Sequence, residues 1–376
     1  MYVLDENFET LAVFDIYESF IWTDRYNEYG DFEACFSPDD PLLKYMVAYN
    51  YIWRRDSEHL MMIKRIEITT DPTEGSRAIV TGESLESILK NRVIDKQTIL
   101  KGSLQNGIRT LLYQTIISPQ NSDRRISNFV FKNSSNPDIT KLTLDAQYFG
   151  ENLYDVVSEI CYNEQIGFKV TLNDDNQFVF ELYKGVDRTY DQDDYPYIIF
   201  SPHYENLLNS DYVYDIDNVR NVAYIAGEEP DIPEEPEEGE APEEKPKPII
   251  TTQLIAMTGS GKGLKRREIF VDGSNLKTYY RDDDGNTVYL SEGEYIPQLE
   301  EKGKEQLAEY YAEESFDGQI QGDYQWVIGK DYFMGDIVEI ENEYGRTAKC
   351  RVVEMITSED TEGTKFYPSF EAIDES

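Results

Sequence analysis

The stretch Gly167-Phe-Lys-Val-Thr-Leu172, followed after the turn Asn173-Asp-Asp-Asn176 by Phe178-Val-Phe-Glu-Leu182, decides the fold of this chain. Apolar and polar residues alternate along both segments, which is typical of strands that bury one face. The polar turn between them predicts a hairpin. A Gly185-Val-Asp-Arg-Thr189 corner and further strand patterns continue as far as Asp272, and no residue in this stretch is arranged for chemistry, so we expect no catalytic centre here.

The composition predicts a large, β-rich protein with several domains. A chain of 376 residues exceeds one small core, and about two to four domains are expected for such a length. The 29 tyrosines and 17 phenylalanines favour strands, because aromatic side chains fit a pleated, half-buried surface.

The net charge of −39 excludes some classes of partner. Nucleic-acid affinity depends largely on Lys and Arg releasing counterions, and anionic membranes repel acidic surfaces, so we expect no sequence-specific nucleic acid and no membrane as a partner. We also expect no membrane segment and no signal peptide, because no apolar run has the required length. Close packing of like-charged copies would require pairing or screening of charge.

The spacing of the apolar residues indicates an α+β, β-rich, multidomain organisation. Short helices are expected over 85–90, after Ser103, over 151–163 and over 297–313, with Pro297 in the first turn of the last. We expect Gly303 to cost that helix about 1 kcal/mol relative to Ala. The predicted parts are a first small antiparallel β-barrel over 1–100, an α+β domain with two helices and a hairpin over 101–185, a discontinuous second β-barrel over 186–227 and 315–376, and an inserted region over 228–314 with a β-hairpin and a helix.

The inserted region begins with an acidic, proline-rich loop. Residues 228–248 hold ten acidic residues and six prolines. Such a sequence buries too little apolar surface to order itself, and like-charge repulsion extends it. We expect a solvated loop, with a docking arm for a basic partner as the alternative.

No coherent catalytic, cofactor or metal site is expected. Thr258-Gly-Ser-Gly-Lys-Gly263 lacks the first glycine and the terminal hydroxyl of a phosphate loop, and Ser87-Ile-Leu-Lys90 lacks the companion motifs of a Ser-x-x-Lys enzyme. His59 and His203 have no second ligand at metal spacing. Cys35, Cys161 and Cys350 are expected to be three reduced, buried thiols. Whether the acidic clusters bind Ca²⁺ or Mg²⁺ stays open.

A series of short motifs resembles siphophage, prophage and tailocin tail proteins related to the phage baseplate hub. They are Phe20-Ile-Trp-Thr-Asp-Arg-Tyr26 with Gly30-Asp-Phe-Glu33, Ile63-Lys-Arg-Ile-Glu-Ile68, Val80–Leu89, Phe178–Thr189, Ile199-Phe-Ser-Pro202 with Glu205-Asn-Leu207, Asn221–Gly227, Gly261–Asp272, Gly335–Val338 and Arg351–Glu354. The resemblance covers nearly the whole chain. It implies two barrel domains with two inserted domains, forming a ring at the tail tip.

The resemblance implies a structural, non-enzymatic hub in the tail tip of a virion, assembled in a bacterial cytoplasm. Expected partners are further copies of the chain, as a trimer or alternatively a hexamer, a tail tube or distal tail protein, and a tip spike, lysin or receptor-binding protein. Two other functions stay open: a tail-associated cell-wall hydrolase that uses a carboxylate pair, and a tail protein that binds the host surface.

Three arginines are candidates for an assembly interface. Arg188, Arg266 and Arg267 are among few cations in an acidic chain, so each either pairs with Asp or Glu inside the fold or pairs across a subunit seam. The sequence leaves both interpretations open.

Overall fold

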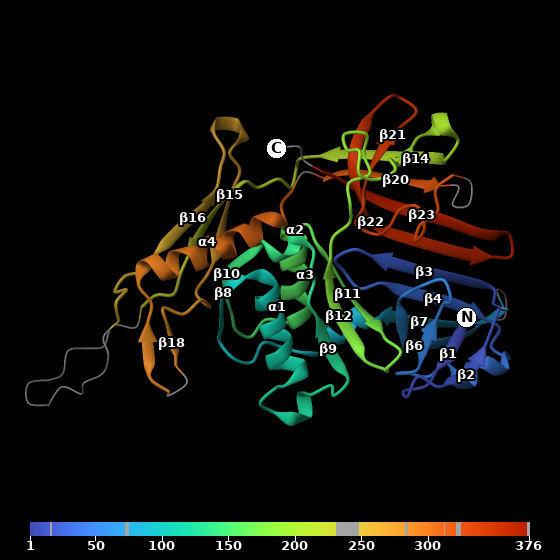
Figure 1. Cartoon of the computed structure of the whole chain (residues 1–376), viewed down its shortest axis with the longest axis horizontal. Helices are drawn as coiled ribbons and strands as arrows, with labels where there is room; N and C mark the ends of the chain where they lie inside the picture. The colour runs from blue at the N-terminus through green and yellow to red at the C-terminus, as the bar shows by residue number, and fades with distance from the viewer. Residues whose placement is uncertain are drawn as a thin grey trace, which may run out of the picture.

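The computed structural model describes residues 1–15, 17–71, 75–230, 248–282, 285–311, 313–320 and 325–373. Within these ranges, thirteen strands form one large sheet, in which the amino-terminal and carboxy-terminal parts of the chain lie side by side (Figure 1). The first part supplies β1 (Tyr2–Leu4), β2 (Thr10–Val13), β3 (Ser19–Arg25), β4 (Asp31–Phe36), β5 (Tyr51–Trp53), β6 (Leu60–Asp71) and β7 (Gly75–Ser84). The last part supplies β13 (Ile199–Phe200), β14 (Leu207–Asp215), β20 (Glu313–Ile320), β21 (Ile337–Glu341), β22 (Thr347–Asp360) and β23 (Gly363–Ala372).

The strand order is β14-β20-β23-β22-β3-β4-β7-β6-β5-β1-β2, and β21 pairs with β22 and β13 beside this path. The predicted alternation is confirmed in β4, where Phe32, Ala34 and Phe36 are buried while Glu33 is exposed. The β-rich character with some helices is therefore confirmed. Among the described residues the pairings form an open path, and closure into two barrels is not seen in them.

Strand β22 joins the two parts of the sheet. Its second half pairs antiparallel with β3, from Glu354 opposite Arg25 to Asp360 opposite Ser19. Arg25 reinforces this seam: its Nε donates to Glu354 Oε2 at 2.7 Å, and its Nη1 donates to Asp31 Oδ2 at 2.6 Å. One side chain thus ties three neighbouring strands together.

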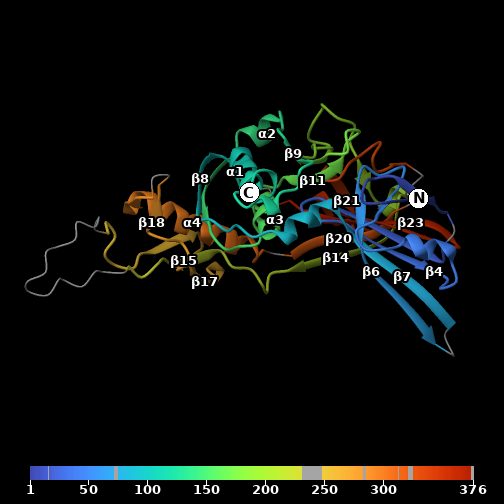
Figure 2. The same ribbon diagram turned by 90° about the horizontal axis from the view of Figure 1, so that it is seen from below.

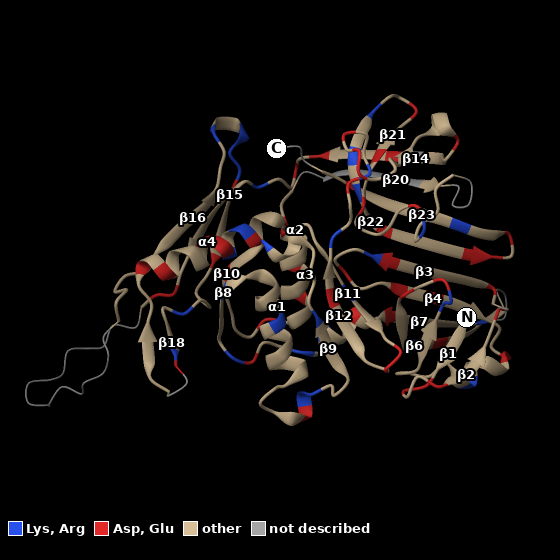
Figure 3. Cartoon of the chain, viewed as in Figure 1, with Lys and Arg blue, Asp and Glu red and all other residues tan. Residues whose placement is uncertain are grey.

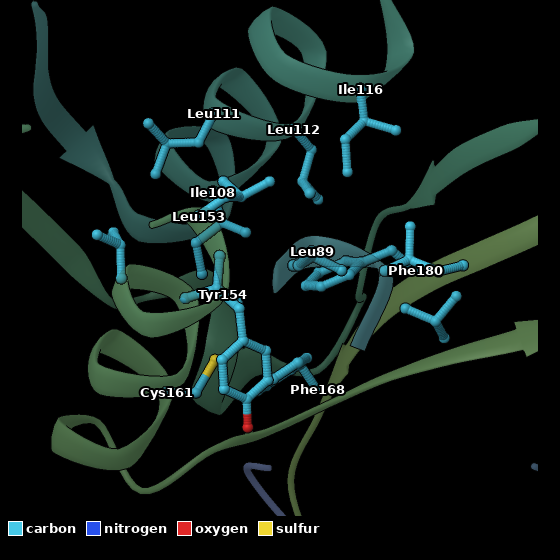
Figure 4. Close-up of a cluster of buried hydrophobic side chains, with 14 of the residues drawn as sticks. Leu89, Ile108, Leu111, Leu112, Ile116, Leu153, Tyr154, Cys161, Phe168 and Phe180 are labelled. Carbon is cyan, nitrogen blue, oxygen red and sulfur yellow. The ribbon is translucent and has the colours of Figure 1, made fainter. Parts of the chain in front are cut away.

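The middle of the chain packs three helices against short sheets. Helices α1 (Leu104–Leu112) and α3 (Leu153–Asn163) meet in an apolar core that Figure 4 shows, with Ile108 and Leu111 facing Leu153. The other elements are a 3₁₀ helix at Leu85–Asn91, α2 (Pro137–Thr140), β8 (Thr98–Ser103) paired with β10 (Thr143–Tyr148), and β9 (Phe129–Lys132) in a sheet with β11 (Gly167–Leu172) and β12 (Phe178–Tyr183).

The helix and hairpin predictions for this middle part are confirmed. Ser103 precedes α1 as expected, although its side chain makes no capping hydrogen bond. Helix α3 is capped by Asn152, whose side chain accepts from the backbone N of Tyr154 at 2.9 Å. Strands β11 and β12 pair antiparallel as the predicted hairpin requires, with Val170 opposite Phe180.

The inserted region forms a small sheet covered by a helix. Strand β15 (Val222–Ala226), at the end of the range 186–227, lies between β16 (Ile255–Gly259) and β17 (Glu268–Asp272). Helix α4 (Glu292–Ala308) packs on one face of this sheet, and β18 (Tyr279–Arg281) pairs with β19 (Thr287–Tyr289) nearby. Most of the acidic loop expected over 228–248 lies outside the described residues.

The start of α4 corrects one expectation. Pro297 lies inside the helix and not in its first turn, because Ser291 and Glu294 form a capping box that begins the helix at Glu292. Pro297 has no N–H, so it leaves the carbonyl of Gly293 without its usual helical donor.

The hairpin of β6 and β7 extends away from the body of the molecule, as Figure 2 shows. Residues 64–70 on β6 are exposed on both faces, including Ile66 and Ile68. Beyond the end of β4, only residues 69–71 of β6 and residues 75–77 of β7 form a two-stranded ribbon, and such a ribbon is only marginally stable alone.

Two glycines of α4 provide a matched test of its packing. A Cβ on Gly303 would lie 2.4 Å from Ile225 Cδ1 and 2.7 Å from Thr258 Cγ2, whereas a Cβ on Gly293 would meet only Ser291 Oγ at 4.0 Å. We predict that Gly303→Ala destabilises the protein by roughly 1–3 kcal/mol through overpacking. Gly293→Ala should be neutral or stabilise by up to about 1 kcal/mol. Urea unfolding of both variants measures this, and equal shifts would contradict the close approach of α4.

Candidate assembly surface

Arg188 forms an internal ion pair. Its side chain is 10% exposed, and its Nε lies 2.5 Å from Asp336 Oδ2. The same carboxylate accepts from the backbone N of Val186 at 2.8 Å and from that of Phe333 at 3.0 Å. The Arg188 guanidinium also lies 5.6 Å from the centre of the Tyr195 ring. Arg188 therefore fixes the corner at Gly185–Thr189 and the loop between this corner and β13.

Arg266 and Arg267 lie elsewhere, in the loop between β16 and β17. Arg266 forms an ion pair with Glu268, and its Nη2 donates to the Tyr224 hydroxyl at 2.8 Å. Arg267 donates from its guanidinium to the carbonyl of Ile216, and its backbone N donates to Asn221 Oδ1 at 2.9 Å. The structure thus brings two of the three candidate arginines together and places Arg188 in a different part of the fold. Their role at a seam stays a prediction.

The loop that holds these two arginines is the basic tip, residues 262–267. Lys262, Leu264 and Lys265 are exposed, and Leu264 is fully so. Figure 3 shows Lys and Arg gathered at the projecting end of this loop between β16 and β17. The side chain of Asn221 donates to the carbonyl of Lys265 at 2.7 Å, so the tip is held against the start of β15.

Below the tip, the small sheet has an uncovered apolar face. Tyr224 lies opposite Met257 on β16 and opposite Phe270 on β17, so the three side chains form one row across the sheet. Met257 is 49% and Phe270 69% exposed, since α4 covers the other face. Arg266 Nη2 lies 3.7 Å from Met257 Sδ and binds Tyr224, so its guanidinium joins this row.

A separate hollow of about 760 Å³ lies between the middle part and the inserted region. It is lined by two tyrosines, Tyr279 and Tyr280, by several polar side chains, and by the cations Lys96, Lys101 and Arg281. Aromatic faces next to polar and charged groups can receive a small polar ligand.

A buried carboxylate pair lies between α3 and α4. Burial and the neighbouring Glu305 carboxylate raise the pKa of Glu159 to about 7, and burial also raises the pKa of Glu305. The Tyr148 hydroxyl donates to Glu305 Oε1 at 2.6 Å, but Glu159 Oε1 has no hydrogen-bond partner in the described structure. Neither carboxylate lines the 760 Å³ hollow. The sequence analysis missed this pair, because its members are 146 residues apart on different helices.

His59 has a partner that the sequence did not reveal. Its Nδ1 lies 3.6 Å from Glu86 Oε1, which also accepts from the backbone N of Val170 at 2.7 Å. Burial disfavours the charged imidazole, but the hydrogen bond with Glu86 and the carboxylate of Asp24 outweigh it and raise the pKa of His59 to about 9. This ion pair therefore connects the first part of the chain to β11.

The three cysteines differ in their burial. Cys161 and Cys350 are buried as expected, but Cys35 is half-buried, because it lies on the outward face of β4. Across the described ranges, no three His, Cys, Asp or Glu side chains are grouped so that they could hold a metal ion. Among the described helices, none is both long and apolar enough to cross a membrane.

The carboxylate pair makes the stability of the protein depend on pH. The pKa of Glu159 is higher in the folded than in the unfolded protein, so the folded state binds the extra proton between about pH 4.5 and 7. Stability therefore falls as pH rises through this window. We predict that Glu159→Gln, which stays neutral, stabilises the protein at pH 8 by about 1–3 kcal/mol and has little effect at pH 4.5. Urea unfolding at both pH values measures this, with the exposed Glu33→Gln as control, and an equal effect of Glu159→Gln at both would contradict it.

Comparisons with known proteins agree with this fold. The model of the Siphovirus ReqiPepy6 Gp37-like protein family matches residues 1–370. No curated protein matches the sequence. The resemblance to siphophage tail proteins is therefore confirmed.

Solved tail proteins share the architecture at low sequence identity. The 43 kDa tail protein of prophage MuSo2 from Shewanella oneidensis is 9% identical, with a TM-score of 0.57 and 96% of each chain covered. A tail protein from Neisseria meningitidis MC58 is 13% identical, with a TM-score of 0.54, 99% of this chain and 95% of that chain covered. Prophage tail protein gp18 from Listeria monocytogenes EGD-e is 14% identical, with a TM-score of 0.50, 100% of this chain and 94% of that chain covered.

The family match and the shared architecture agree over nearly the whole length, so this chain belongs to the Siphovirus ReqiPepy6 Gp37-like protein family and has the fold of phage tail proteins.

Proposed function

We propose that this protein is a structural, non-enzymatic hub of the phage tail tip, in which several copies close a ring at the end of the tail tube. The observation that carries the proposal is the fold shared with phage tail proteins, which covers 96% of this chain and 96% of the Shewanella oneidensis tail protein. The sequence motifs that resemble hub-related tail proteins extend over the same length.

The proposed architecture has two antiparallel barrels with two inserted parts. In support, the first and last parts of the large sheet have separate apolar cores, one around Phe20, Trp22 and Phe32 and the other around Phe200 and Val352. The barrels would comprise residues 1–100 and residues 186–227 with 315–376. The intervening α+β domain at 101–185 and the inserted region at 228–314 would face other tip proteins. We favour a trimer, with a hexamer as the alternative.

The proposed partners are a tail tube or distal tail protein and a spike, lysin or receptor-binding protein. The projecting hairpin of β6 and β7 supports such contacts. Ile66 and Ile68 are exposed on β6, opposite the buried Val80 and Ala78 of β7, and a neighbour packed against the hairpin would cover them.

One observation favours a second candidate function, binding of the host surface. The 760 Å³ hollow places Tyr279 and Tyr280 beside charged groups of both signs, among them Arg281 and Glu294, and this lining suits a polar glycan. The hydrolase alternative has less support, because Glu159 and Glu305 lie between packed helices and do not line this hollow.

The hub proposal predicts self-association and a defined place in the particle. We expect sedimentation velocity of the purified chain to show a concentration-dependent ring species of three or six copies. Electron microscopy of particles with a gold label on the carboxy-terminal end should place the label at the tail tip. A chain that stays monomeric at high concentration and is absent from particles would overturn the proposal.

A further inference from the structure

We propose that the basic tip and the apolar row below it dock on residues 187–197 of a neighbouring copy, which form an acidic, tyrosine-rich loop. This inference rests on the proposed ring and names the contact that closes it. The proposed interface adds Lys262, Leu264 and Lys265 to the candidate residues. Arg188 would not cross the interface itself but would hold the loop 187–197 in shape.

The apolar row has the composition of the centre of a protein interface. Such centres are enriched in Tyr, Phe, Met and Arg and are surrounded by a polar rim. Here Met257, Tyr224, Phe270 and Arg266 lie side by side, because the strand register aligns the first three and Arg266 binds two of them. The row belongs to a sheet supported from behind by α4, so it is presented on a rigid element.

The basic tip supplies the charge of this surface. Four of its six residues are cations, and no other six-residue segment of the chain holds as many. Arg266 pairs with Glu268, but within the part of the chain that the structure describes no ion pair engages Lys262 or Lys265. In a chain with 74 acidic and 35 basic residues, two exposed lysines without a partner are available to an acidic surface.

The loop over 187–197 has the complementary chemistry. Asp193 and Asp194 are exposed, and no ion pair engages either among the described residues. The neighbouring Tyr190, Tyr195 and Tyr197 are each about half exposed or more. Their rings can receive lysine ammonium groups and apolar side chains, since aromatic faces attract cations.

The loop is held in shape by internal contacts. The Arg188 guanidinium lies beneath Tyr195 and pairs with Asp336, and the Tyr190 and Tyr197 rings lie 4.8 Å apart between centres. Gln192 donates to the carbonyls of Thr189 and Tyr195. The surface therefore needs little rearrangement to bind, which reduces the entropy lost on association.

A second copy of the chain is the occupant that the charges favour. Copies with a net charge of −39 repel each other, so each contact between them needs local cations, and the basic tip is the densest source of them. The tip and the loop are different surfaces, so the contact is head-to-tail. Such contacts form a closed ring when the rotation between neighbours closes.

Charge reversal in the full-length chain tests the inference. Lys262→Glu with Lys265→Glu should lower the association constant at least tenfold, and Asp193→Lys with Asp194→Lys should do the same. The control combines Lys44→Glu with Lys330→Glu, which makes the same charge change as the tip variant at exposed positions elsewhere and should leave association within about twofold of the wild type. Sedimentation velocity over a concentration series measures all three, after thermal unfolding has shown that each variant folds.

Combining the four changes at the tip and the loop in one chain should restore association, because the two changed positions of the tip are then negative and the two changed positions of the loop are positive. An equimolar mixture of the two double variants should restore rings with an even number of copies only, since complementary contacts must alternate around the ring. A trimer would therefore stay dissociated in the mixture, and a hexamer would form.

The outcomes separate this inference from the hub proposal. If the wild type associates and both double variants match the control, the docking inference is wrong and the ring stands. If the tip variant dissociates but the combined variant does not recover, another surface or another protein is the occupant, and the inference is overturned. A wild-type chain that never associates and is absent from particles overturns the hub proposal itself.

Discussion

The pairing of β3 with β22 is the constraint on which the rest of the structure depends. It joins strands whose paired residues are separated by more than 300 positions, and it turns two sheets into one. Arg25 bridges the seam to Glu354, while Arg54 lies 3.5 Å from Glu359. The middle part and the α4 sheet lie between these strands in the sequence, so both are inserted between segments of one large sheet.

Buried carboxylates and exposed lysines of this protein differ in how their charge is balanced. Cations inside the fold neutralise buried carboxylates, as Arg188 does for Asp336, and charge-assisted hydrogen bonds of this kind are among the stronger ones. Where two carboxylates meet, as at Glu159 and Glu305, burial raises the pKa of both in spite of Lys302, whose Nζ lies 3.8 Å from Glu305 Oε2. Because the interior uses its arginines in this way, the unpaired lysines at the basic tip stand out against an acidic surface.

Much of the fold could be predicted from local patterns in the sequence. Contacts between segments that are distant in the sequence could not be predicted in this way. The alternation of Phe32, Ala34 and Phe36 identified a strand because burial of one face leaves a period of two in the sequence. The start of α4 was misplaced because Pro297 was given more weight than the capping box of Ser291 and Glu294. The packing role of Gly303 depends on Ile225, which is 78 residues away, so the sequence showed only a weak helix former.

The candidate surface was only partly predictable, because some of its residues are neighbours in the sequence and others become neighbours only in the folded protein. The run of cations that includes Arg266 and Arg267 is visible in the sequence, but the row of Met257, Tyr224 and Phe270 exists only through the register of three strands. The buried partner of Arg188 is 148 residues away in the chain. No spacing rule reveals such neighbours, because loops of very different length can close at similar entropic cost.

The seam between β3 and β22 also sets an order of events during synthesis. The ribosome makes β3 early, yet the strand that covers its open edge emerges only when residues 354–360 have been translated. Until then, a nascent chain exposes hydrogen-bonding groups that could recruit a strand from a neighbouring polypeptide. Synthesis of β22 and protection of the β3 edge from misassembly are thus the same step.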